Sequence, residues 1–256
     1  MASALDIAEK YDIPVSIINE AFKKINNKTS YLVSVSGKIG AGKDTIAPEI
    51  MKRLNVDSDS VHEFFARPLK MEVNEVINII VLSGSADNAV DEIMKKLDVT
   101  QKMADDTVSF IFDDVRSNPN ITSYDRTQGM RRALQYWGTE VRRKQDDKYW
   151  VKKAVYSSLS LIAEGKSVYV TDARFVNEID ALIEVGGIAI RLNMSPEEQE
   201  KRIWERDGVH MTEEARNHPS EISLDDYENF VVSIFTDRTT PDEVVEKVME
   251  GIKDYV

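Results

Sequence analysis

Apolar residues fall into short continuous runs that alternate with longer stretches of helical spacing. The runs at 31–35, 61–66, 167–172, 188–192 and 230–235 predict five strands. The stretches between them place apolar residues three and four positions apart, which predicts helices. Strands that alternate with helices build a mostly parallel sheet covered on both faces. We therefore expect an α/β fold of three layers with about five strands.

Several regions lie outside this simple alternation. Residues 1–28 predict a helical extension in two pieces, the second capped by Ser16, ahead of a main domain at 29–256. We expect an inserted region at about 67–150, in which 107–125 has no clear pattern, and a lid at about 194–221. The polar stretch 207–223 is expected to be a mobile loop.

A glycine-rich stretch follows the first predicted strand and leads into a helix. Gly37, Gly40 and Gly42 let the backbone N–H groups turn inward, and Lys43 adds a cation at the helix start. This spacing matches the P-loop pattern that holds nucleotide phosphates, although Asp44 and then Thr45 follow the lysine, where Ser or Thr normally comes first. A chance glycine turn is the alternative. The predicted ATP contacts are Gly37, Lys38, Gly40, Ala41, Gly42, Lys43, Asp44 and Thr45.

A carboxylate ends the predicted strand at 167–172. Parallel strands present ligand groups at their carboxyl ends, so Asp172 fits a ligand of magnesium through water. Its plainer interpretation is a helix cap. Arg174 and Glu178, four residues apart, would in the plain interpretation be a surface ion pair.

A basic segment interrupts an otherwise acidic chain. Residues 116–153 hold ten Lys or Arg and four Asp or Glu, whereas the whole chain has a net charge of −12. Within the helix predicted at 128–145, Arg131, Gln135 and Arg142 form a stripe beside an apolar one, and Arg132 lies further round. This stripe either binds a second phosphate and a base or is a solvated charged face.

Two further arginines follow a strong helix start. Ser195 and Pro196 predict the cap and first turn, after which Arg202 and Arg206 share a face. Phosphoryl transfer between two bound phosphates needs positive charge, in-line positioning and exclusion of water. A closing segment that carries Arg202 and Arg206 would supply both the charge and the closure.

Composition excludes several classes of protein. The chain has no cysteine and no apolar run of membrane-spanning length, and its start lacks the features of a signal peptide. The acidic balance argues against stable nucleic-acid binding. We expect a cytoplasmic protein whose N-terminal helices serve packing or contact between subunits, with a homodimer as one assembly considered.

Several motifs together resemble the deoxynucleoside monophosphate kinases of tailed bacteriophages, which are similar to adenylate kinase. The resemblance runs over most of residues 31–237. It rests on Gly40-Ala41-Gly42-Lys43-Asp44-Thr45, Phe65-Ala66-Arg67-Pro68-Leu69-Lys70, Leu134-Gln135-Tyr136-Trp137-Gly138-Thr139-Glu140 with Arg142, Thr171-Asp172-Ala173-Arg174-Phe175-Val176-Asn177-Glu178, and His218-Pro219-Ser220-Glu221. The two long middle motifs are the most specific of these.

The resemblance implies transfer of the γ-phosphate of ATP to a deoxynucleoside 5′-monophosphate, with magnesium. It implies catalytic roles for Lys43, Arg142, Asp172, Arg174, Arg202 and Arg206. It places the acceptor against Arg67, Lys70, Arg131, Arg132, Gln135, Trp150, Asp172, Arg174 and Glu178. It assigns magnesium to Asp44, Thr45 and Asp172.

Two other functions also fit the loop. A small-molecule kinase of the phosphomevalonate type would use the same Lys-Asp loop with another acceptor. A non-catalytic nucleotide sensor would bind ATP without turnover and would use its N-terminal helices to contact a partner or DNA.

Overall fold

A computed structural model describes residues 2–256 of the chain. The chain divides into two compact units. We call them the sheet unit, which holds the residues up to 64 together with 151–256, and the helical unit, residues 65–150.

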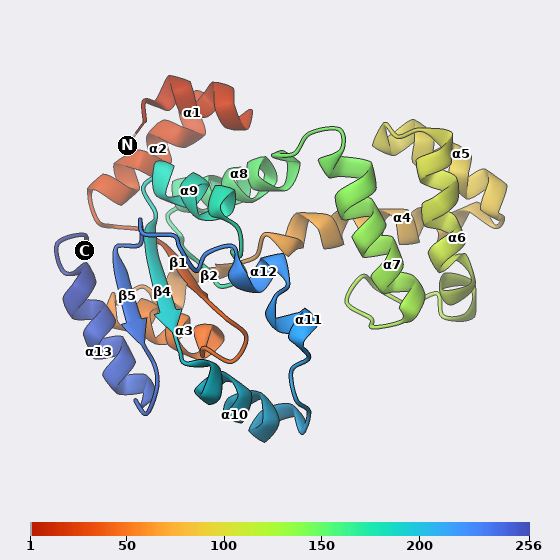
Figure 1. Cartoon of the computed structure of the whole chain (residues 1–256). Coiled ribbons are helices and arrows are strands. Elements are labelled where there is room, and N and C mark those ends of the chain that lie inside the picture. The colour runs from red at the N-terminus through yellow and green to blue at the C-terminus, as the bar shows by residue number, and fades with distance from the viewer. Residues whose placement is uncertain (1) are drawn as a thin grey trace. The chain divides into compact units, whose positions relative to one another are not determined.

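The sheet unit is built on five parallel strands (Figure 1). Their order across the sheet is β2-β3-β1-β4-β5. The strands are β1 (Leu32–Gly37), β2 (Ser60–Glu63), β3 (Ser167–Val170), β4 (Ile188–Asn193) and β5 (Val232–Phe235). The central strand β1 is buried along nearly its whole length, as a parallel strand covered on both faces should be.

Helices cover both faces of this sheet (Figure 1). Val33 and Val35 of β1 pair in register with Ile188 and Ile190 of β4, and all four point into a core shared with α3 and α13. The three-layer α/β fold expected from the sequence is thus confirmed. The helices of the sheet unit are α1 (Ala4–Tyr11), α2 (Val15–Asn26), α3 (Lys43–Arg53), η1 (Asp57–Asp59), α8 (Tyr149–Ala163), α9 (Val176–Glu184), α10 (Pro196–Asp207), α11 (Glu213–Arg216), α12 (Pro219–Ile222) and α13 (Pro241–Ile252). The first two residues of α8, Tyr149 and Trp150, belong to the helical unit.

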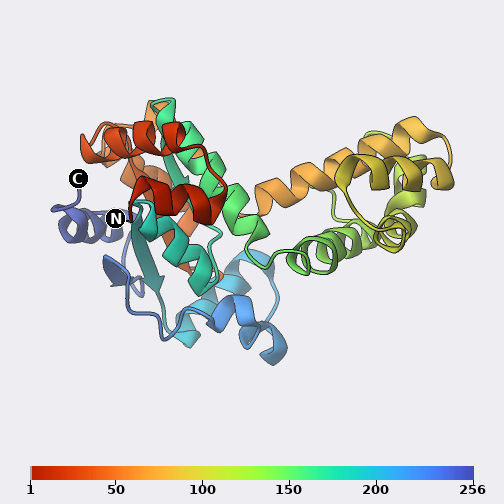
Figure 2. The same cartoon turned by 90° about the horizontal axis from the view of Figure 1, so that it is seen from above.

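Two short N-terminal helices, α1 and α2, lie beside α9 (Figure 2). The hydroxyl of Tyr11 donates to Glu184 at 2.6 Å, and the Lys10 ammonium lies 2.5 Å from the same carboxylate. The break between the helices is where the sequence predicts it, but Ser16 is not the cap. Helix α2 begins at Val15 after Pro14, so Ser16 already lies inside its first turn.

The helical unit has its own core. Val73, Ile93, Ile111, Met130 and Trp137 are among its buried side chains. Its elements are α4 (Ala66–Ser83), α5 (Ala86–Leu97), α6 (Gln101–Ser117), α7 (Gln128–Tyr136) and η2 (Trp137–Arg143).

Three local predictions need correction. Residues 107–117, expected to be irregular, belong to α6, which buries Val108, Ile111 and Val115 at helical spacing. The second strand ends at Glu63 and α4 begins at Ala66, because a helix tolerates a proline such as Pro68 in its first turn. The stretch 207–223 contains the short helices α11 and α12.

The helix predicted at 128–145 changes type along its length. It is α-helical to Tyr136 and then π-helical from Trp137 to Arg143. A π-helix closes its hydrogen bonds over five residues instead of four, which shifts the face on which later residues lie. Arg131 is therefore exposed while Arg142 is buried, and the predicted single stripe of Arg131, Gln135 and Arg142 is wrong.

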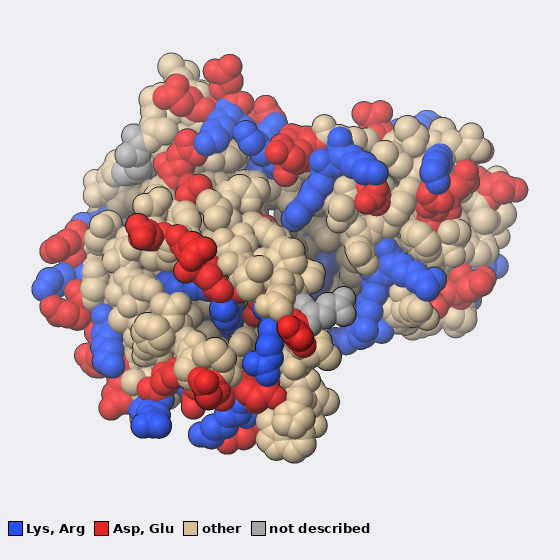
Figure 3. All heavy atoms as spheres, viewed as in Figure 1, with Lys and Arg blue, Asp and Glu red and all other residues tan. Residues whose placement is uncertain are grey.

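Charges of both signs are interspersed over the face of the molecule shown in Figure 3. None of the helices described is long and apolar enough to cross a membrane.

Candidate functional site

The glycine loop, residues 36–45, lies at the carboxyl end of the central strand. The connection that follows β1 leads toward β2 on one side, whereas the connection that follows the neighbouring β4 leads to β5 on the other side. Ligands of open α/β sheets bind at this kind of switch point. The loop then enters α3 at Lys43.

The three glycines of this loop are required by its backbone. Gly40 and Gly42 have φ angles of 88° and 85°, in the left-handed region that residues with a Cβ rarely adopt. Gly37 has a different reason, since a Cβ there would lie 2.7 Å from the carbonyl oxygen of Leu192 on β4. The loop can therefore fold tightly against the sheet only with glycine at these positions.

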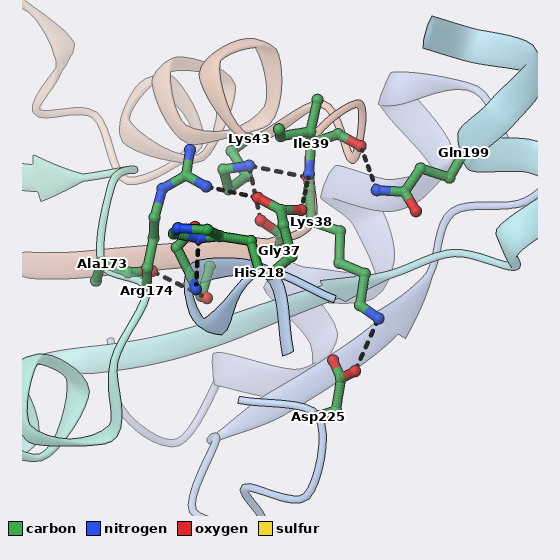
Figure 4. A network of polar contacts seen from close by, with 12 residues as sticks. Gly37, Lys38, Ile39, Lys43, Ala173, Arg174, Gln199, His218 and Asp225 are labelled. Atoms are coloured by element: carbon green, nitrogen blue, oxygen red, sulfur yellow. Dashed lines mark hydrogen bonds and ion pairs between the residues drawn. The ribbon is translucent and has the colours of Figure 1, made fainter. Parts of the chain in front are cut away.

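Side chains engage the carbonyl oxygens of the loop (Figure 4). The Lys43 ammonium donates to the carbonyls of Gly37 and Lys38 at 2.7 and 3.0 Å. Gln199 of α10 donates to Ile39 O at 3.1 Å. With its carbonyls held in this way, such a loop offers amide groups to an anion.

Burial changes the acidity of Lys43. Desolvation, followed by the nearby positive charge of Arg174, lowers the pKa of Lys43 from 10.5 to about 8. The negative charges of Asp44 and Glu221 oppose this shift but do not cancel it. A half-buried lysine that faces another cation is a group prepared to receive a negative charge.

A cavity of about 440 Å³ opens at the loop, a size that suits a small-molecule ligand. Cationic, carboxylate and hydroxyl side chains line it together with the loop backbone. Its lining residues are Ile39, Gly40, Gly42, Lys43, Asp44, Thr45, Phe64, Thr171, Asp172, Arg174, Arg202 and Arg206. The structure thus brings together most of the donor-side residues singled out from the sequence.

The Asp44 carboxylate is held by a series of two hydrogen bonds through Thr171 and His62. The hydroxyl of Thr171 donates to Asp44 Oδ1 at 2.6 Å, and His62 Nε2 lies 2.8 Å from the same hydroxyl oxygen. Since Thr171 donates to Asp44, it accepts from His62, which places a proton on Nε2 of that histidine. The Asp44 carboxylate is therefore oriented at the cavity, with Asp172 nearby in the lining.

Arg174 and Glu178 take different partners at the start of α9. Glu178 is buried, and its Oε2 accepts from the backbone N–H groups of Arg174 and Phe175 at 2.8 and 3.2 Å, which caps the helix. The Arg174 guanidinium instead reaches Glu221, with Nη1 2.6 Å from Oε1. Glu178 thereby fixes the backbone from which Arg174 projects into the cavity.

The two arginines of α10 differ in how firmly they are held. Arg202 donates through Nε to Glu198 at 2.8 Å, through Nη2 to Thr236 O at 2.7 Å and through Nη1 to Gly40 O at 3.3 Å. Arg206 pairs with the adjacent Asp207 and is largely exposed. Helix α10 begins as predicted, with Ser195 as cap and Pro196 in the first turn.

In the helical unit, Glu72 collects three donors. Trp137 Nε1 and Arg142 Nε donate to its Oε2 at 2.9 and 2.8 Å, and the Tyr149 hydroxyl donates to Oε1. The Arg142 guanidinium also lies 5.4 and 5.1 Å from the ring centroids of Trp137 and Tyr149. Burial and hydrogen bonding to Glu72 raise the pKa of Tyr149. Arg142 is therefore fixed in place by the core of its own unit.

The remaining acceptor candidates of this unit lie in varied surroundings. Arg131, Arg132 and Gln135 are exposed on α7, and Lys70 lies 4.2 Å from the centroid of the Tyr124 ring. Arg67 is half-buried near the start of α4. Trp150, by contrast, is buried and donates to Gly138 O at 3.0 Å, so its indole already has a structural partner.

Sequence reasoning assigned no role to several residues that shape the site. Glu221 is part of a quoted motif, but the sequence does not reveal that it contacts the loop. Arg191 lies buried on β4, and Glu72 lies within an apolar helix. An arginine inside a run of strand residues is the one signal that could have marked Arg191, because such a charge needs a buried partner.

Comparison with known proteins shows to which protein family the chain belongs. No curated protein matches the chain. The solved structure of an uncharacterized protein from Eubacterium ventriosum matches with a TM-score of 0.37 and 11% identity, over 88% of this chain and 99% of that one. The sequence model described as deoxynucleotide monophosphate kinase matches residues 63–218, more than half of the chain. The chain therefore belongs to the deoxynucleotide monophosphate kinase family and phosphorylates deoxynucleoside monophosphates.

Proposed function

We propose that ATP is the phosphoryl donor of this kinase and that the glycine loop is a P-loop that holds its phosphates. The observation that supports this most is the cavity in which the loop, Lys43, Asp172 and Arg174 meet. Cations and backbone donors that surround one space suit the outer phosphates of a nucleoside triphosphate. The transferred group then lies where positive charge is concentrated.

Lys43 has to change partners when the donor binds. Its ammonium now donates to the carbonyls of Gly37 and Lys38, and a phosphate oxygen would replace them. The negative charge of the phosphate favours the protonated amine and so opposes the desolvation that lowers the pKa of Lys43. The lysine then stays charged where charge develops during transfer.

The residues at the cavity also fit magnesium. Asp44, Thr45 and Asp172 supply hard oxygen ligands, and magnesium in kinases is held by one or two carboxylates together with substrate phosphates. Among the residues described, no group of three or more acidic or histidine side chains forms a closed metal cage. Such an open arrangement agrees with a metal that arrives with the nucleotide. When bound, magnesium would neutralise phosphate charge.

We further propose that side chains of the helical unit bind the acceptor nucleotide. Arg174 and Asp172, which line the donor cavity, remain predicted acceptor contacts. The exposed Arg131, Arg132 and Gln135 on one helix offer donors for a phosphate and a base. The other acceptor candidates are Arg67, Lys70, Arg142, Trp150 and Glu178. Arg202 and Arg206 would act as arginines of the lid at about 194–221, where they add charge and exclude water.

The setting of the enzyme is also a proposal. We propose that it acts in the cytoplasm, that of the host cell if it is a bacteriophage protein. A homodimer and the lack of stable nucleic-acid binding remain predictions. The phosphomevalonate-type kinase and the nucleotide sensor receive no support from the family match.

A single experiment tests the proposed donor and acceptor. The protein is incubated with ATP, magnesium and each common deoxy- or ribonucleoside monophosphate, and diphosphate product is measured. Lys43→Ala should lower turnover by at least ~10²-fold, because it removes charge stabilisation of the transferred group. Lys52→Ala, on the exposed side of the same helix, is the control and should keep normal turnover. Normal turnover by Lys43→Ala would refute the assignment of the loop.

A further inference from the structure

Two carboxylates on one short segment lie against the glycine loop. Glu221 belongs to α12. Asp225, which Figure 4 shows beside Lys38, follows four residues later. Their partners in the loop are the consecutive residues Ile39 and Lys38. A segment far from the loop in sequence therefore holds two neighbouring loop residues at once.

Glu221 joins the loop to the arginine of the cavity wall. Its Oε2 accepts from the backbone N–H of Ile39 at 3.0 Å, and its Oε1 accepts from Arg174 Nη1 at 2.6 Å. The Glu221 side chain is only 3% exposed, whereas that of Arg174 is 37% exposed. Ile39 and Arg174 both line the cavity, so one buried carboxylate fixes two parts of its wall.

Asp225 makes a second connection, which joins the glycine loop to strand β4. It lies 2.8 Å from the Lys38 ammonium and 3.2 Å from Arg191 Nη2. Arg191 in turn donates to Ser36 Oγ at 3.0 Å, and Ser36 is its register partner on β1. The base of the loop is thus tied through Arg191 to the sheet.

From this network we propose that Glu221, assisted by Asp225, is a positioning residue that sets Arg174 and the glycine loop for phosphoryl transfer. The inference deepens the proposed function, since it rests on the loop holding the donor triphosphate. A carboxylate suits this task because its two oxygens accept from two separate donors. An amide in the same place has one acceptor oxygen and would leave one buried donor unpaired.

The consequence for catalysis differs between the two residues. Loss of the Glu221 carboxylate frees Arg174 to turn, which lowers kcat, and leaves the loop less ordered, which raises the KM for ATP. Loss of Asp225 loosens the loop without releasing Arg174, so it raises the KM for ATP and leaves kcat nearly unchanged. A residue needed only for stability would alter neither constant in the folded protein.

The test compares three variants of the full chain. Glu221→Gln and Asp225→Asn remove the proposed contacts, and Glu184→Gln is the matched control, because Glu184 also pairs across elements, with Lys10 and Tyr11. Each is measured for ATP binding by calorimetry, for kcat and KM, and for thermal unfolding. We expect Glu221→Gln to lower kcat/KM for ATP by about 10- to 100-fold, the size of effect when a charged hydrogen bond is lost. Glu184→Gln should change only the unfolding temperature.

The outcomes separate this inference from the proposed function. If the unaltered protein does not bind ATP, the proposed donor site is wrong. If it binds ATP but Glu221→Gln matches Glu184→Gln in kcat and KM, the positioning role is overturned. Should Glu221→Gln fail to fold, the more exposed Asp225 decides: weaker ATP binding in Asp225→Asn supports the inference, and unchanged binding overturns it.

Discussion

At the scale of single residues, the site depends on charges held away from bulk water. The clearest case is Lys43, whose pKa is lowered to about 8, first by burial and then by Arg174. Below this pH the amine of the protein without bound nucleotide is charged, and above it the amine is neutral. The charge that the proposed mechanism requires therefore depends on pH near neutrality.

The first prediction concerns this pH dependence. In the free enzyme, kcat/KM for ATP should fall as the pH rises through about 8, because Lys43 loses its proton there. The fall in kcat should occur at higher pH, since bound phosphate favours the charged amine. Lys43→Arg should abolish the fall near pH 8 at reduced overall activity, because arginine stays protonated. If the fall in kcat/KM near pH 8 is unchanged in Lys43→Arg, a group other than Lys43 causes that fall.

The lowered pKa also affects stability. The unfolded chain holds the Lys43 proton up to about its usual value of 10.5, whereas the folded protein releases it near 8. Between these values the unfolded state binds more protons, so the free energy of unfolding should rise with pH. Below about pH 8 the full penalty for a buried charge is present.

A second prediction at this scale concerns Arg131. Its side chain is exposed on α7 and is proposed to bind the acceptor phosphate. Arg131→Ala should raise the KM for the deoxynucleoside monophosphate more than the KM for ATP, as steady-state kinetics with each substrate varied would show. Arg116→Ala, also exposed in the helical unit, is the control. A larger effect on ATP would place Arg131 on the donor side.

At the scale of elements, the sequence predicts the features that depend on local residue patterns. It does not predict the features that depend on tertiary contacts. The five strands, the glycine loop and the start of α10 depend on residues close together in the chain, and the sequence predicts them. The π-helix at Trp137–Arg143 was missed because no local residue pattern distinguishes it from an α-helix. Helix α6 was missed because polar residues between Val108, Ile111 and Val115 obscure their spacing.

The candidate site divides in the same way. Lys43, Asp44 and Asp172 were found because loop and strand-end motifs are local. The position of Glu221 against Ile39 depends on how a segment far along the chain folds back, which no local pattern contains. The burial of Arg142 against Glu72 was missed for the same reason.

The third prediction tests the contact between α6 and α7. A Cβ added at Gly129 would lie 2.2 Å from the Phe110 carbonyl oxygen and 2.6 Å from Asp114 Oδ2. The backbone must shift to admit it, so Gly129→Ala should lower the free energy of unfolding by about 1–3 kcal/mol, as overpacking does. Urea denaturation measures the change, with exposed Ser109→Ala as control. No loss of stability would mean that the two helices pack less closely than described.

At the scale of the whole molecule, the described residues of each unit include a hydrophobic core of that unit's own. One is shared by the sheet with α3 and α13, and the other lies within the helical unit. All residues that line the cavity belong to the sheet unit. Stability and donor binding should therefore respond separately to changes in the helical core.

The fourth prediction follows from this division. Ile93 is fully buried in the helical core, so Ile93→Ala should lower the free energy of unfolding by about 2–5 kcal/mol. Calorimetry should show ATP affinity close to that of the unaltered protein, because no cavity residue is touched. Leu82→Ala, at an exposed position of α4, should leave both properties nearly unchanged. A large loss of ATP affinity in Ile93→Ala would show that the units are coupled.

The carbonyl contacts of the glycine loop have one more consequence. A peptide plane in a glycine turn can flip and present oxygen in place of hydrogen, which would repel a phosphate. Gln199 and Arg202 secure the oxygens of Ile39 and Gly40, so a flip of either plane requires breaking a hydrogen bond. The loop is thereby preorganised for anions, and little of the binding energy of the nucleotide is spent on reshaping it.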